Sequence, residues 1–207
     1  MTHTLHRKGT VDNLAGDYVL FAIAAQTVNA KGSAPKFRKF ADIVLKHNPV
    51  SFGDMKTGNQ FAVGLEKIQN NYQDNSIVHA VFTDEQTVAL ALKELSDAEL
   101  GLSIVVSGLL EQVEECCEQV GIETHTVEHS LGIFGQTNCL PSEEVLQIST
   151  MCGHGMVAFS LVKHMADQVK KGVLTPQKAA ERLAKQCHCG VFNPDRAARI
   201  LEEMTRC

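Results

Sequence analysis

The sequence contains no tryptophan and few aromatic residues, which make up 5% of its 207 residues. It also lacks a long apolar run. The longest apolar stretch, from Tyr18 to Ala25, is far shorter than the ~20 residues that a membrane-spanning helix needs. Basic residues near the N-terminus have no apolar segment behind them, so we expect no signal peptide. These absences predict a soluble, cytoplasmic protein.

An excess of positive charge is missing as well. The chain has 19 Lys and Arg against 24 Asp and Glu, which gives a formal net charge of −5. Binding to nucleic acid without sequence preference depends on an excess of Lys and Arg. We therefore expect neither a nucleic-acid nor a membrane partner. The composition is compatible with a small-molecule substrate. It does not indicate an oligomeric state.

Several common catalytic signatures are absent too. No Gly-x-Gly-x-x-Gly follows a predicted strand, and there is neither a Walker sequence nor a Gly-x-Ser-x-Gly elbow. The first two motifs hold phosphate groups and the third presents a serine nucleophile. Function is therefore sought in other residue types.

Cysteine, in contrast, is plentiful, with seven residues. A disulfide framework of a secreted protein usually has a short chain and an even number of cysteines. An odd number in a chain of this length, with no signal segment, indicates a reducing compartment. Clustered cysteines there more often bind metal or carry redox chemistry than form disulfides.

Hydrophobic periodicity predicts an α/β protein with a small mixed sheet and packed helices over residues 1–136, followed by an all-helical, cysteine-containing part over 137–207. Whether the first 76 residues join the same sheet is left open. Strands are expected within 1–11 and at 17–25, 77–83, 100–107 and 124–133. Helices are expected at 35–47, 84–95, 109–120, 142–150, 153–171, 176–186 and 194–205, with caps at Ser33, Asp84, Thr175 and Asn193.

The first group of candidate residues is Cys152-Gly153-His154-Gly155. We expect Cys152 at the start of the helix over 153–171, where free N–H groups stabilise a thiolate. The two glycines would let the backbone approach a bound group closely. The alternative is a tightly packed helix start in which the cysteine is only a small buried apolar residue.

The second group is Cys187-His188-Cys189-Gly190, in a short connection between two predicted helices. Two thiols separated by one residue can face the same atom or cluster, whereas they are poorly placed to bridge each other. The alternative is a helix C-cap that contains sulfur. The Cys-x-Cys-Gly-x-Phe stretch resembles the C-terminal cysteine pair of A-type iron–sulfur carrier proteins. The helical pattern around it differs from the β-rich body of that family, so no function is transferred.

Together, Cys152, Cys187 and Cys189 suit an iron–sulfur cluster of the [4Fe–4S] type with one open or differently ligated iron. Cys139 is a possible fourth ligand. Alternatively, His154 or His188 joins the three thiolates in a Cys3His zinc site. We favour the cluster because backbone donors to sulfur tune clusters. In addition, the separation of about 34 residues between Cys152 and Cys187 exceeds that of most compact zinc modules.

Three functions are compatible with these residues. In a cluster enzyme, an open iron would act as Lewis acid on a small molecule, with His154 as acid or base and Arg196 as an anion clamp. His125 and His129, expected on one strand face, would form a pocket wall or simply a half-exposed surface. A structural zinc site would instead pin the helical part beside a binding or interaction module. The third function is an enzyme with Cys152 as nucleophile.

Overall fold

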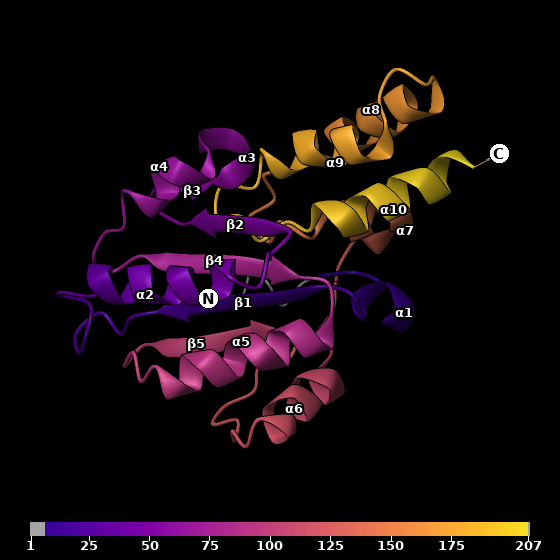
Figure 1. Ribbon diagram of the computed structural model, residues 1–207. Helices are drawn as coiled ribbons and strands as arrows, with labels where there is room; N and C mark the ends of the chain where they lie inside the picture. Colours follow the sequence, from indigo (N-terminus) through magenta and orange to yellow (C-terminus); the bar gives the residue numbers. More distant parts are fainter. Residues whose placement is uncertain (1–6, 207) are drawn as a thin grey trace.

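The computed structural model describes residues 7–206, which contain a five-stranded sheet in the order β3-β2-β4-β1-β5 (Figure 1). The strands are β1 (Tyr18–Ile23), β2 (Ser51–Asp54), β3 (Gly58–Asn59), β4 (Ile77–Phe82) and β5 (Ser103–Ser107). The α/β class is confirmed. Neighbouring strands pair antiparallel, so the sheet is antiparallel where a mixed one was expected.

The sheet is antiparallel because the chain makes two interlocked crossover connections. The helix α2 (Ala34–Leu45) carries the chain from β1 to β2, and β4 occupies the position between those two strands. The helix α5 (Glu85–Asp97) carries the chain from β4 to β5, and β1 lies between them. Each crossover joins strands that run the same way, yet each skips one antiparallel neighbour. This is the split β-α-β arrangement, and it includes strands from the first 76 residues.

Side chains alternate between the two faces of the sheet, as the pleat of a strand requires. In β1, Tyr18 and Leu20 belong to one apolar cluster, whereas Val19 and Phe21 belong to another. The first face is covered by α2, α5 and α6 (Leu110–Gln119), of which α2 and α5 lie in front of the sheet in Figure 1. The second face is covered by α7 (Glu143–Ser149), α8 (Phe159–Lys170), α9 (Pro176–Ala184) and α10 (Pro194–Thr205).

Asp84, Thr175 and Asn193 cap their helices as predicted, whereas Ser33 lies at the N-cap of α2 without a hydrogen bond from its side chain to the helix. The side chain of Asp84 accepts a hydrogen bond from the backbone N–H of Thr87, and Thr175 and Asn193 cap α9 and α10 in the same way. The shorter helices α1 (Val11–Leu14), α3 (Gln60–Val63) and α4 (Leu65–Gln69) and the 3₁₀ turn η1 (Thr137–Cys139) were not expected. Each is too short to show a helical period in the sequence.

Two predicted elements are wrong. The stretch over 124–133 is irregular rather than a strand, and its apolar side chains Val127, Leu131 and Ile133 are exposed. Because these side chains are exposed, the segment buries little apolar surface that could hold it in the sheet. The helix expected from 153 begins at Phe159, because Gly155 adopts a positive φ of 67° that helical residues do not have. The strand expected within 1–11 falls partly outside the described residues, and 7–10 are not in a strand.

The C-terminal helices and the sheet share one apolar core. Met151 and Phe192, from the helical part, belong to the same buried cluster as Phe21 and Val81 of the sheet. The boundary at 136/137 stays a prediction, but the helices that follow it complete one face of the sheet. Within residues 7–206, the helices are all too short or too polar to cross a membrane.

Candidate functional site

Three thiols from distant parts of the sequence lie together on the second face of the sheet. Cys152 follows α7, while Cys187 and Cys189 lie in the turn between α9 and α10. Hydrogen bonds join the side chain of Cys187 to both Cys152 and Cys189. All three are at most 2% exposed, and His154 Nδ1 lies 3.9 Å from Cys189 Sγ. We call these three cysteines the thiol centre.

The turn that carries Cys187 and Cys189 lies directly against β2. Gly190 adopts a positive φ of 77°, and a Cβ atom on it would come within 2.7 Å of the Gly53 backbone. A Cβ atom on Gly53 would in turn lie 2.5 Å from the carbonyl oxygen of Cys189. Both positions therefore require glycine, because any side chain would push the turn away from the strand.

Hydrogen bonds from outside the turn hold its carbonyl groups. The donors are Asn59 Nδ2 to Cys187 O (2.9 Å), Ser51 Oγ to Gly190 O (2.8 Å) and Arg7 Nη2 to Val191 O. Their three side chains come from β3, β2 and the segment before α1. The turn is thus anchored at three of its peptide groups by residues far away in the sequence.

Backbone N–H groups are directed at the sulfurs. The N–H of Val191 lowers the pKa of both Cys187 and Cys189, and the N–H groups of His154 and Met156 lower the pKa of Cys152. Such donors stabilise negative charge on sulfur. These N–H groups oppose the effect of burial on the thiols, although Cys152 does not lie at a helix start as expected.

The thiols differ in acidity. The hydrogen bond from Cys187 lowers the pKa of Cys189. At Cys187 the hydrogen bond with Cys152 lowers the pKa, but the bond with Cys189 and burial raise it, to about 12. The hydrogen bond with Cys187, followed by burial, raises the pKa of Cys152. The first negative charge therefore resides on Cys189, and a nucleophile in this centre would be Cys189 rather than the predicted Cys152.

No group of three or more His, Cys, Asp or Glu side chains within residues 7–206 is arranged to hold a metal ion. Cys139 is exposed at the end of η1, and its Sγ lies 3.9 Å from Gln136 Oε1. The exposed ring of His188 is hydrogen-bonded to the carbonyl oxygen of Met55 at 3.1 Å. The contacts of the thiol centre described above include neither of these residues.

His125 and His129 lie elsewhere. They line a cavity of about 740 Å³ between the segment 123–130 and β5. Among the described residues that line this cavity, none is a cysteine of the thiol centre. The structure therefore does not place these histidines in the same pocket as the three thiols.

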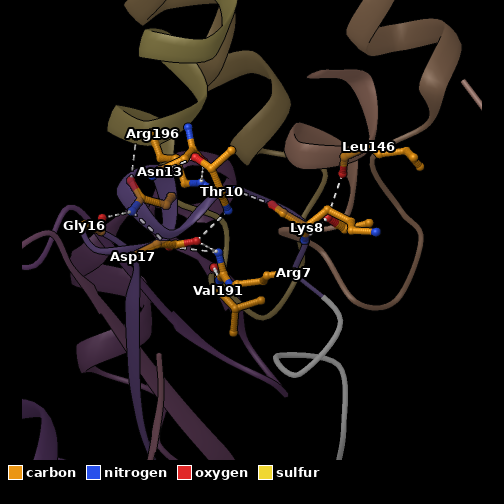
Figure 2. Close-up of polar contacts among 11 residues, drawn as sticks. Arg7, Lys8, Thr10, Asn13, Gly16, Asp17, Leu146, Val191 and Arg196 are labelled. Atoms are coloured by element: carbon orange, nitrogen blue, oxygen red, sulfur yellow. Dashed lines mark hydrogen bonds and ion pairs between the residues drawn. The ribbon is translucent and has the colours of Figure 1, made fainter. Parts of the chain in front are cut away.

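Arg196 is completely buried in a polar network at the start of α10 (Figure 2). Its guanidinium donates to Asp17 Oδ2 at 2.7 Å, to Asn13 Oδ1 at 2.5 Å and to the carbonyl oxygen of Lys8. Burial lowers the pKa of Arg196, and the Asp17 carboxylate opposes that effect. Because its donors are used by protein groups, we assign Arg196 a structural role in place of the anion clamp.

Asp17 extends this network to the thiol centre. Its carboxylate also binds Arg7 Nη1 at 2.7 Å and Asn193 Nδ2 at 3.0 Å. Arg7 in turn donates to the carbonyl oxygen of Val191, as Figure 2 shows. The buried ion pairs thus connect β1 and the start of α10 to the turn that holds two of the thiols.

Sequence patterns did not reveal the residues that support the turn. Ser51, Asn59 and Arg7 have no motif around them. Buried His79 lies opposite Gly53 in the pairing of β4 with β2, with its ring 5.3 Å from that of Phe21. A histidine in the middle of the apolar run IVHAVF is a signal that could have marked this strand as a neighbour of the site.

No protein family, curated protein or solved structure matches this chain. Its function is therefore argued from the chemistry of the thiol centre.

Proposed function

We propose that the chain is an iron–sulfur protein in which Cys152, Cys187 and Cys189 each bind one iron of a [4Fe–4S] cluster. The observation that carries the proposal is the meeting of these buried thiols from two turns, with backbone N–H groups directed at their sulfurs. Hydrogen bonds to sulfur are one of the means by which proteins tune such clusters.

The long separation of Cys152 from Cys187 in the sequence favours a cluster over zinc. A zinc ion requires its ligands to meet at one atom, with zinc–sulfur bonds of about 2.3 Å. The part of the chain that the structure describes holds no such group of three ligands. In a cubane cluster each thiolate binds a different iron, so the sulfurs surround the cluster instead of meeting at a point. Thiols that contact one another, as these three do, would have to move apart to bind three different irons.

Three cysteine ligands leave one iron of a cubane without a cysteine, and such an iron acts as a Lewis acid when the cluster is bound. His154 is the titratable side chain in contact with Cys189, and it is exposed. It could therefore exchange protons with a small molecule bound beside the centre.

The test is anaerobic purification followed by iron and sulfide analysis. We expect a brown protein with broad absorbance at about 400 nm. Ser substitution at Cys187 or Cys189 should abolish cluster uptake, whereas Cys117→Ser, at a buried thiol on the opposite face of the sheet, should retain it. Thermal unfolding of each metal-free variant distinguishes a lost ligand from a lost fold. Retained uptake in both ligand variants would overturn the assignment.

Two other results would replace the cluster with the alternatives. A colourless protein with one zinc per chain would establish the structural zinc site. A protein without metal and with rapid alkylation at Cys189 would establish a cysteine nucleophile, which is the second candidate function. The contact of 3.9 Å between His154 Nδ1 and Cys189 Sγ favours that candidate, because a neighbouring imidazole activates a thiol.

A further inference from the structure

The strand β5 lies at one end of the sheet and has β1 as its neighbour on one side, as Figure 1 shows. All of its residues line the cavity of about 740 Å³ that separates it from the segment 123–130. Within residues 7–206, no second strand pairs with β5, and no backbone hydrogen bond joins it to that segment. A free strand edge of this kind is a template for a further strand.

The cavity is lined by apolar side chains from both faces of the sheet. Phe21 and Val105 belong to the cluster of the second face. Leu92 and Ile104 belong to the cluster of the first face. Successive side chains of a strand point to alternate faces, so an extended chain that pairs with β5 reaches both groups. A small molecule on one face of the sheet would reach only one of them.

The charged side chains of the lining indicate the chemistry of the partner. Apart from the two histidines named above, the described lining residues that carry charge are Arg7, Asp17, Glu99, Glu123 and Glu128. The first two form an ion pair with each other. The three glutamates are exposed, and within residues 7–206 none of them forms a salt bridge. They favour a basic partner. A second copy of the chain would bring like charges together at this edge, which opposes its binding there.

We propose that the free edge of β5 binds an extended segment of a partner protein, apolar in its centre and basic at its ends, as an added strand. Backbone hydrogen bonds provide the affinity, and the apolar groups on the two faces select alternate side chains. The site is separate from the thiol centre, whose cysteines are not among the described residues of the lining. The inference therefore does not depend on the proposed cluster.

The test uses the full chain and a fluorescent, end-capped heptapeptide in which three valines alternate with two threonines between terminal lysines. We expect saturable binding by fluorescence anisotropy. Hydrogen exchange of β5 amides, measured by NMR, should slow when the peptide is bound, because the added strand protects them. A peptide with terminal glutamates should bind about tenfold more weakly. A peptide with proline at its three central positions should bind at least about tenfold more weakly, because proline lacks the N–H that pairs with a strand.

Charge reversal tests the protein side of the contact. The double variant Glu123→Lys/Glu128→Lys should bind the lysine peptide about tenfold more weakly and the glutamate peptide more tightly. Both residues are exposed, so the fold should be retained. The matched control is Glu66→Lys/Glu203→Lys, which changes the net charge equally at exposed residues that are not among the described lining residues. The control should bind the lysine peptide within about twofold of the natural chain, because distant charges are screened.

Slower exchange confined to β5, together with the loss in the Glu123→Lys/Glu128→Lys variant alone, would establish the site. Absence of saturable binding would overturn the inference, as would equal binding of the proline peptide or equal losses in the two double variants. Sedimentation of the peptide-free chain tests the other occupant. A dimer with protected β5 amides would show that a second copy covers the edge, and it would overturn the inference too.

Discussion

Cys116 and Cys117 on α6 are buried on one side of the sheet, and the thiol centre is buried on the other. The surroundings of the two groups differ. The thiol of Cys116 lies 3.5 Å from the carbonyl oxygen of Glu85, to which it donates. Burial raises the pKa of Cys116 to about 11 and raises that of Cys117 as well. These thiols are therefore kept neutral.

The thiol centre is as deeply buried, but backbone N–H groups oppose the effect of burial on its thiols. At Cys189 the hydrogen bond from the Cys187 thiol, helped by the N–H of Val191, outweighs burial and lowers the pKa. The comparison shows that burial alone keeps a thiol neutral, and that the pKa of a buried thiol falls only where hydrogen bonds to its sulfur outweigh burial, as at Cys189.

The largest expected effect comes from the ion pairs that tie the thiol centre to the N-terminal segment. Asp17→Asn would leave the buried guanidinium of Arg196 without its carboxylate. The free energy of unfolding should fall by about 3–5 kcal/mol, as measured by urea denaturation. With increasing urea, the cysteines of the thiol centre should become reactive toward alkylation at a lower concentration than Cys116. The reason is that, among the described residues, the Asp17 network contacts the turn of the thiol centre and does not contact Cys116.

The matched control for this change is Asp97→Asn, which breaks an exposed pair with Lys93. It should change stability by less than about 1 kcal/mol. Equal losses in the two variants would show that the Asp17 network contributes no more than a surface pair.

A smaller effect is expected from crowding the turn. Gly53→Ala should lower the free energy of unfolding by about 1–3 kcal/mol and displace Cys189, with loss of cluster uptake measured as iron per chain. Gly64→Ala is a control at a glycine where a Cβ atom meets nothing within 4 Å, so that only the strain of its positive φ of 84° is added. That variant should keep its iron. Full iron content in Gly53→Ala would contradict the role given to the close approach.

The difference in acidity between the two thiol groups can be measured directly. In the metal-free protein near neutral pH, Cys189 should be alkylated about tenfold or more faster than Cys116. The lowered pKa of Cys189 gives it more thiolate at that pH, whereas burial raises the pKa of Cys116 to about 11 and keeps it protonated. Mass spectrometry of the alkylated peptides gives both rates, and equal rates at every pH would remove the distinction.

The smallest effect is expected from Cys116→Ala. The substitution removes a neutral sulfur from an apolar core and should cost about 1 kcal/mol of stability, as measured by thermal unfolding. Iron content and the spectrum of the cluster should be unchanged. A loss of iron would mean that α6 contributes to the centre after all.

Local patterns predicted much of the fold. The apolar run that became β1 and the caps at Asp84 and Asn193 were recognised because their signals lie within a few residues of each other. The strand expected over 124–133 failed because a strand depends on a partner, which a local pattern does not contain. The choice of Cys152, Cys187 and Cys189 as one group came from the sequence, whereas Arg196 proved to be part of a buried ion-pair network.

The amino-acid sequence by itself determined the α/β class, the helical C-terminal part and the set of cysteines that could act together. Only the tertiary structure decided that the three thiols lie together, and that Ser51 and Arg7 hold the turn that carries two of them. The physical reason is distance along the chain: Ser51 and Gly190 are 139 residues apart. The position of the turn depends on contacts of that kind, which no local periodicity encodes.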